Sequence, residues 1–263
     1  MGKGFHITHG DRQGGNGTPD GVTLLFRHGA RPDAAAVRAL AESTRAFSVS
    51  HDPTEGGNSP NENDNWLELL INGLTFDMYG LAGGSPVEMP ALRHNFGLDD
   101  AMLGAVQAVS LVAGPHLAGG ENMMPIVRSQ LALSLRLATL PGVVAIVWTP
   151  AQSAMAVDHF TTLVSTWLEG GAFPALGLTA FSLALDGGLQ SDGLAFFTGQ
   201  ELRLEPELAE DGIAATKLAV RLINQLVEYG KVTERFEMTG PDGAPLVLEP
   251  SANGAFVRVR AGR

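Results

Sequence analysis

The chain has 263 residues, of which 44% are hydrophobic, and this length allows one large domain or two small ones with a buried core. It contains no cysteine, which excludes disulfides, thiolate metal sites, iron–sulfur clusters and cysteine nucleophiles. Its 28 acidic and 17 basic residues give a net charge of −11, and a field of that sign repels the phosphate backbones of nucleic acids.

No apolar run approaches the roughly 18 to 20 residues that a membrane span requires. Residues 1–21 are rich in glycine and polar side chains and lack the apolar core of a secretory signal. We therefore expect a flexible leader over residues 1–21, a cytoplasmic protein, and neither nucleic acid nor a membrane as its partner.

The first half of the chain alternates strand-like and helix-like patterns. We expect a strand at 22–26, a helix at 34–47, a polar loop at 48–65, a hairpin within 66–79, a buried strand at 105–113, a helix at 121–140 and a second buried strand at 143–148. The hairpin is predicted because Asn72-Gly73 separates two apolar runs, and this dipeptide suits a two-residue turn.

The second half continues with shorter elements. We expect a helix at 158–169, strands at 178–186 and 194–204, a helix at 211–229, a hairpin that pairs 235–239 with 246–249, and a last strand at 255–260. The turn of this hairpin is marked by Pro241-Asp242-Gly243, three residues that are typical of tight turns.

If the hairpin within 66–79 is counted as one β element, the order of elements from 22 to 148 is β-α-β-β-α-β, which predicts an α+β fold with a ferredoxin-like core and a mostly antiparallel sheet. A doubly wound parallel sheet is disfavoured because hairpin signals outnumber β-α-β units. The C-terminal β-β-α-β-β half either extends this sheet or forms a second lobe. We therefore expect one domain over residues 22–263, with possible sub-lobes at 22–150 and 151–263.

One segment has the composition of a catalytic site. Arg27-His28-Gly29-Ala30-Arg31-Pro32 follows the first strand and precedes the first helix. It resembles the Arg-His-Gly-x-Arg-x-Pro motif of the histidine acid phosphatases and the Arg-His-Gly of the phosphoglycerate mutases. In such enzymes the imidazole attacks phosphorus while guanidinium groups hold the phosphoryl oxygens.

Two features of the chain depart from that pattern. Pro32 comes one position too early, and the second histidine is expected in a His-Gly pair, whereas the candidate His116 lies in Gly-Pro-His-Leu. The alternative interpretation is a basic turn between a strand and a helix. Catalytic candidates on the phosphohistidine hypothesis are therefore His28, Arg27, Arg31 and His116.

Other catalytic and cofactor motifs are missing from the sequence. No histidine pair has the i, i+4 spacing of a zinc protease, no Gly-x-Gly-x-x-Gly or Walker loop follows a strand, and no Gly-x-Ser-x-Gly is present. We therefore expect no bound cofactor and no metal site.

The order of several short segments resembles a bacterial family, the domain of unknown function number 4261. They are Thr23-Leu24-Leu25-Phe26 with Pro32-Asp33, Ala113 to Leu117, Val143 to Pro150, Asp192-Gly193-Leu194, Phe197 to Leu202, and Glu228-Tyr229-Gly230. Asp192 departs from the family, which tends to have a threonine there. The resemblance implies no catalytic residue, because the family has no established activity, and it implies that Arg27-His28-Gly29 is an ordinary strand-to-helix junction.

These observations favour a non-enzymatic binding or regulatory domain that meets an unknown protein or a small ligand. The alternative is a phosphohistidine-type phosphatase or mutase that uses the segment around His28. A third hypothesis is an accessory protein that pairs with a basic partner, motivated by the net charge of −11. We also expect a possible homodimer, since sheets of this kind often leave an edge or a face to bury.

Overall fold

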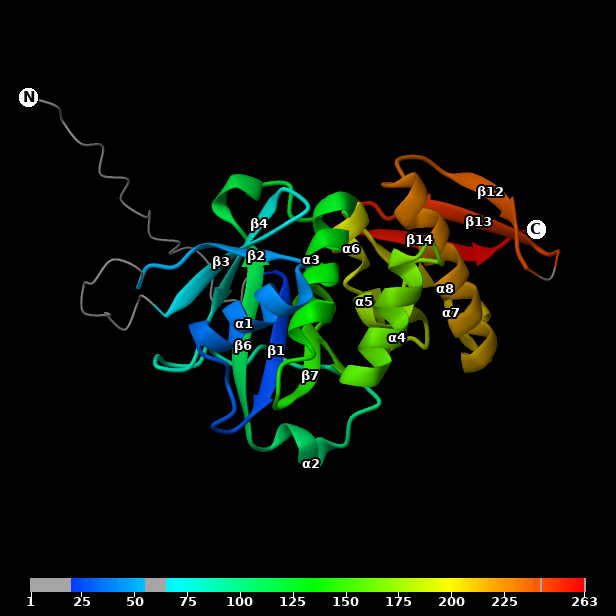
Figure 1. Cartoon of the computed structure of the whole chain (residues 1–263). Helices are drawn as coiled ribbons and strands as arrows, with labels where there is room; N and C mark the ends of the chain where they lie inside the picture. Colours follow the sequence, from blue (N-terminus) through cyan, green and yellow to red (C-terminus); the bar gives the residue numbers. More distant parts are fainter. Residues whose placement is uncertain (1–19, 55–64, 242, 263) are drawn as a thin grey trace, which may run out of the picture.

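The structure is a computed structural model that describes residues 20–54, 65–241 and 243–262. It confirms an α+β fold built on two mixed, mostly antiparallel sheets. The strands of the first sheet come from residues 22–156 and those of the second from residues 180–261, and the two sheets lie side by side with short helices between them (Figure 1). The expected leader, apart from residues 20 and 21, lies outside the described residues.

Among the described residues, the first sheet has eight strands in the order β2-β3-β4-β6-β1-β7-β8-β5. Their bounds are β1 (Val22–Arg27), β2 (Ser48–His51), β3 (Trp66–Ile71), β4 (Leu74–Tyr79), β5 (His94–Phe96), β6 (Val106–Ala113), β7 (Val143–Trp148) and β8 (Ser153–Ala156). The central strand β1 is antiparallel to both β6 and β7, and among the described strands of this sheet only β5 and β8 pair in parallel. Asn72 and Gly73, with φ of 52° and 77°, make the predicted turn between β3 and β4.

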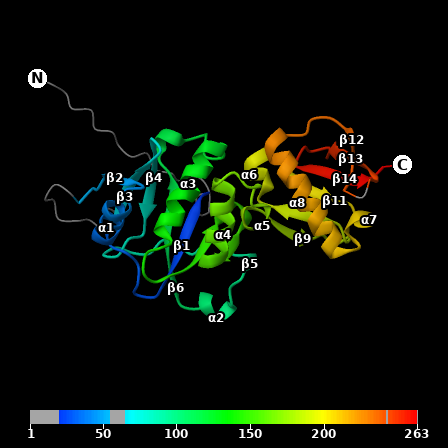
Figure 2. The ribbon, with the colours of Figure 1, turned by 45° about the vertical axis from the view of Figure 1, so that its right-hand side comes forward.

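Three helices cover one face of this sheet, namely α1 (Ala34–Thr44), α3 (Met124–Leu137) and α4 (Val157–Leu168) (Figure 2). Helix α1 begins where Asp33 accepts a hydrogen bond from the backbone N–H of Ala36, at 2.8 Å. The opposite face is partly covered by residues 80–104, which include the short helix α2 (Asp100–Leu103). There Leu98 packs with Leu25 and Ala108 in a second, smaller core.

The second sheet has six strands within the described part of the chain, in the order β12-β13-β14-β11-β10-β9. Their bounds are β9 (Ala180–Leu183), β10 (Leu189–Asp192), β11 (Glu201–Leu204), β12 (Phe236–Thr239), β13 (Pro245–Pro250) and β14 (Phe256–Ala261). The long helix α8 (Gly212–Tyr229) crosses one face of the sheet (Figure 2). The shorter helices are α5 (Ala175–Leu178), α6 (Leu194–Thr198) and α7 (Pro206–Ala209).

Several local expectations differ from the structure. Residues 194–204, expected as one strand, form helix α6, a turn and strand β11, because Gly193 and Gly199 have φ of 94° and 77° and end the helix on either side. The loop expected at 48–65 begins with strand β2, and its residues 55–64 lie outside the described part of the chain. The ferredoxin-like order of six elements is not confirmed, since β2, β5 and β8 add to the predicted strands.

Two elements that follow residue 150, where the possible sub-lobes were expected to divide, lie with the first sheet. Strand β8 and helix α4 follow that residue, yet β8 pairs with β7 in the first sheet and α4 packs on α3. In the described ranges, no helix is both long and apolar enough to cross a membrane.

Candidate functional site

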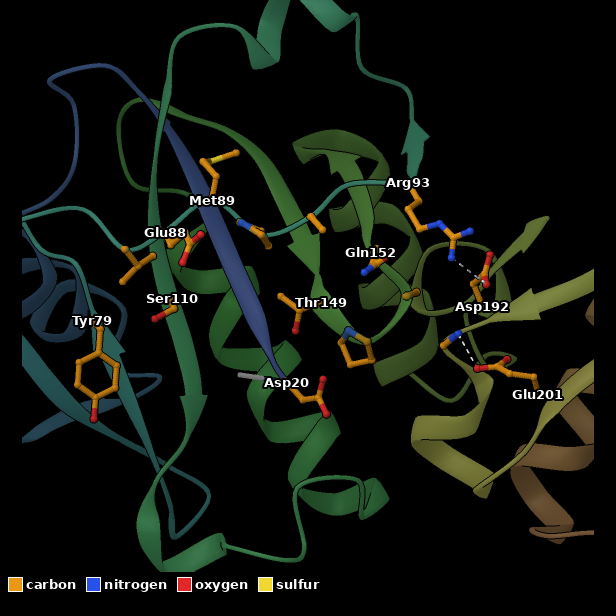
Figure 3. Close-up of a pocket in the computed structure, with 16 residues that line it drawn as sticks. Asp20, Tyr79, Glu88, Met89, Arg93, Ser110, Thr149, Gln152, Asp192 and Glu201 are labelled. Atoms are coloured by element: carbon orange, nitrogen blue, oxygen red, sulfur yellow. Dashed lines mark hydrogen bonds and ion pairs between the residues drawn. The ribbon is translucent and has the colours of Figure 1, made fainter. Parts of the chain in front are cut away.

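A cleft of about 1340 Å³ opens where the uncovered part of the first sheet meets the second sheet (Figure 3). Its walls come from four separate parts of the chain: Asp20 just before β1, the segment 87–93, the turn after β7, and the end of β10 with the start of β11. Ser110 of β6 and Tyr79 of β4 lie on its floor, on the sheet face opposite helices α1 and α3. The cleft is larger than two grooves beside α8, which have volumes of about 550 Å³ and about 420 Å³.

Glu201 occupies the wall that the second sheet provides. Its carboxylate accepts hydrogen bonds from the backbone N–H groups of Gly193 (2.9 Å), Leu194 (3.1 Å) and Ala195 (3.0 Å), which are the unpaired donors at the start of α6. Ser191 Oγ donates a further hydrogen bond of 2.5 Å. Burial raises the pKa of Glu201, and these four hydrogen bonds oppose the rise. Both carboxylate oxygens are therefore engaged in holding α6.

Asp192 connects the two sheets at the rim of the cleft. Its Oδ2 lies 2.8 Å from Nε2 of His94 on β5, the outermost strand of the first sheet, and its Oδ1 lies 3.7 Å from Nη1 of Arg93. Figure 3 shows Arg93 pointing across the rim toward Asp192. The exposed side chain of Arg93 is thus directed at a carboxylate that His94 already contacts.

Asp20 and Glu88 are the two cleft carboxylates with exposed side chains. In the described part of the chain neither forms an ion pair or a side-chain hydrogen bond. The pKa of Asp20 is raised by partial burial and by the nearby negative charge of Glu121. Asp20 is therefore a carboxylate whose ionised form is not stabilised by any neighbour within the described ranges.

The charges of the cleft are unbalanced. Four carboxylates line it, those of Asp20, Glu88, Asp192 and Glu201, whereas Arg93 is the only arginine or lysine among the described lining residues. Low-dielectric walls focus such a field and raise the local concentration of counter-ions of the opposite sign. The arrangement attracts cations and repels phosphate groups.

The residues predicted for phosphoryl chemistry lie elsewhere. Arg27 and His28 are exposed at the end of β1, where the N–H of His28 bonds to the carbonyl of Ala105 at 3.1 Å. Arg31 is half-buried, and its guanidinium donates to the carbonyls of Gly80 (2.6 Å), Leu81 (3.0 Å) and Gly84 (2.8 Å).

The role of Arg31 in the structure is therefore to hold the start of the segment that covers the second core. Burial lowers the pKa of this guanidinium, as expected for a charge removed from water. Its donors are directed at backbone carbonyls and at Gln107, and so are not available to a phosphoryl group beside His28.

His116 lies far from His28. It is exposed in the short 3-10 helix Pro115–Leu117, which follows the last residue of β6, whereas His28 lies beside the first. Strand β6 has eight residues, so its two ends are separated by roughly 25 Å at about 3.4 Å per residue. The structure brings Arg27, His28 and Arg31 into one turn and does not bring His116 to them.

The sequence does not single out the residues of the cleft as a site. Asp192 stands out in it only as a departure from a family pattern, and His94, its partner, is 98 positions away. No spacing signal exists for such a pair, and an excess of acidic residues over the whole chain is the only indication. Within the described residues no group of three or more His, Asp or Glu side chains is placed to hold a metal ion.

Comparisons of the chain with protein-family models, with curated proteins and with solved structures found no match.

Proposed function

We propose that this protein is a non-enzymatic binding domain of the cytoplasm whose cleft takes a cationic ligand, a small molecule or a peptide side chain that carries an amine or a guanidinium group. The observation that carries the proposal is the four carboxylates of the cleft set against a single arginine. The order of the sequence segments also leads us to propose membership of the family of domain of unknown function 4261.

The four carboxylates differ in whether they already bond to groups of the protein, and this difference supports the proposal. Glu201 and Asp192 are engaged with the protein itself, with α6 and with His94 respectively. Asp20 and Glu88 have free carboxylate oxygens in the described structure, and Ser110 and Gln152 add uncharged polar groups to the same wall and floor. A protonated amine bound at the carboxylate of Asp20 or of Glu88 would gain charge-assisted hydrogen bonds that are stronger than neutral ones, and a polyamine offers an amine to each of the two (Figure 3).

The experiment measures binding of spermidine by isothermal titration calorimetry, with inorganic phosphate as the anionic comparison. We expect spermidine to bind and phosphate not to bind. The double variant Asp20→Asn, Glu88→Gln removes both free charges while keeping the shape of the side chains. It is expected to weaken spermidine binding by at least about tenfold, equivalent to about 1.4 kcal/mol.

The matched control is Glu42→Gln, which removes one exposed negative charge from α1 on the opposite face of the sheet. This variant is expected to bind spermidine as the unaltered protein does, at physiological ionic strength where distant surface charges are screened. Equal losses in the control and in the double variant would contradict a specific site. Binding of phosphate, or a stable phosphate on His28 after treatment with a phosphoryl donor, would favour the phosphohistidine alternative instead.

A further inference from the structure

Strand β12 is one of the two edge strands of the second sheet, and Figure 1 shows it along the upper margin of that sheet. It pairs with β13 along one edge, in the register Phe236↔Leu248 and Met238↔Leu246. Its other edge has no neighbouring strand among the described residues. An edge of this kind presents backbone N–H and C=O groups to any strand that approaches it.

The hydrogen-bond phase of the hairpin determines which residues offer those groups. The N–H of Gly240 donates to the carbonyl of Ala244 at 2.7 Å, so residues 240, 238 and 236 direct their backbone groups toward β13. Residues 235, 237 and 239 therefore direct theirs outward. Any strand that adds to this edge must bond to the backbone of Arg235, Glu237 and Thr239.

Along this edge the apolar residues Phe236 and Met238 alternate with the charged residues Arg235 and Glu237. Phe236 is 41% exposed on the face that carries α8, close to Tyr229, which is 81% exposed at the end of that helix. Both line a groove of about 550 Å³ between α8 and β12. On the opposite face Arg235 and Glu237 form an exposed ion pair, with Nη2 2.8 Å from Oε1.

We propose that a second copy of this chain occupies the edge, with two β12 strands pairing antiparallel about a twofold axis at Phe236. This surface is separate from the cleft, and the inference does not rest on the proposed function. The order Arg235-Phe236-Glu237 is self-complementary in this register, because Arg235 of each copy lies opposite Glu237 of the other. The two Phe236 rings lie opposite each other on the face of the groove.

Other twofold registers that centre the axis on a single residue keep the same hydrogen-bond phase, and three of them lie next to Phe236 or within two residues of it. Centring the axis on Arg235 or on Glu237 places like charges directly opposite each other, which is destabilising. Centring it on Met238 places Glu237 opposite Thr239, so neither Arg235 nor Glu237 meets an opposite charge on the other copy. Only the register at Phe236 sets two opposite-charge pairs and an aromatic pair across the strands, each of which stabilises an antiparallel pair.

The experiment measures the mass of the full chain by analytical ultracentrifugation from micromolar to millimolar concentration, at a salt concentration that screens the net charge. We expect a reversible dimer. Glu237→Arg places arginine opposite arginine and is expected to raise the dissociation constant by at least about tenfold. The charge swap Arg235→Glu, Glu237→Arg restores the opposite-charge pairs and is expected to restore the dimer.

Two further variants distinguish the loss of pairing at the β12 edge from general effects on net charge and folding. Glu234→Arg changes the net charge as Glu237→Arg does, but residue 234 faces Met238 in this register, so the dimer is expected to persist. Glu237→Pro removes an outward N–H without touching the ladder to β13, and is expected to give a folded monomer by circular dichroism. A wild-type chain that stays monomeric, a charge swap that fails to restore the dimer, or a dimer that survives Glu237→Pro would each overturn the proposal.

Discussion

Arg31 illustrates how the role of one residue depends on what its side chain contacts. Beside His28 in the sequence it has the composition of a phosphate ligand, whereas in the structure its guanidinium bonds to three backbone carbonyls at 2.6–3.0 Å. Its neighbour Arg27 is exposed at the end of β1. The two arginines therefore give a direct comparison of a structural and a solvent-exposed guanidinium.

We expect Arg31→Met to lower the free energy of unfolding by about 3 kcal/mol, because the carbonyls of residues 80–84 lose a charged donor. Arg27→Met is expected to change it by less than about 0.5 kcal/mol, as is usual for an exposed side chain. Urea unfolding of the two variants measures both values. Equal effects of the two substitutions would show that Arg31 does not anchor this segment.

At the scale of elements, the junction between β10 and α6 places a glycine against the turn that follows β7. Gly193 has φ of +94°, and a Cβ built on it would lie 2.7 Å from the Cβ of Ala151. Gly199, at the other end of α6, has φ of +77° with no atom within 4 Å of its built Cβ. Both positions require a left-handed backbone, and only the first also requires the absence of a side chain.

Gly193→Ala is therefore expected to destabilise the protein by about 1–3 kcal/mol more than Gly199→Ala, which carries only the cost of the backbone conformation. Thermal unfolding of both variants gives the comparison. A Gly193→Ala variant as stable as Gly199→Ala would mean that the contact with Ala151 is relaxed at little cost.

At the scale of the whole molecule, the two sheets meet across an acidic cleft in a chain that carries a net charge of −11. The pKa of Asp20 is raised by partial burial and by Glu121, so this carboxyl takes up a proton at a higher pH than an ordinary aspartate. Its ionised form costs stability in the free protein at neutral pH, and that cost is relieved as the pH falls through the raised pKa.

A bound cation has the opposite effect on the carboxyl of Asp20, because it stabilises the ionised form. The affinity for spermidine, whose amines stay protonated, is therefore expected to fall as the pH is lowered from about 7 to about 4. Calorimetric titrations across this range measure the dependence, and Asp20→Asn is expected to reduce it. An affinity that does not change with pH in the unaltered protein would exclude Asp20 from the binding site.

The sequence predicts the local features of this chain well. The turn at Asn72-Gly73, the strand at 143–148 and the helix that starts after Asp211 are all present, because each depends on backbone preferences and capping within a few residues. Residues 194–198 show that local preferences do not always predict the element that forms. Their apolar pattern suits a strand, yet they form a helix, with Phe196 and Phe197 packed against Trp148 of the first sheet.

The sequence by itself thus determined the α+β class, the mostly antiparallel pairing and most of the individual elements, through periodicity and turn residues that act locally. Only the tertiary structure decided where the acidic residues meet. Asp20, Glu88, Asp192 and Glu201 line one cleft because the residues before β1, the segment 87–93, the end of β10 and the start of β11 meet there, and Arg31 is half-buried because residues 80–84 fold back over it. Such contacts depend on the packing of the two sheets, to which a local pattern of residues is insensitive.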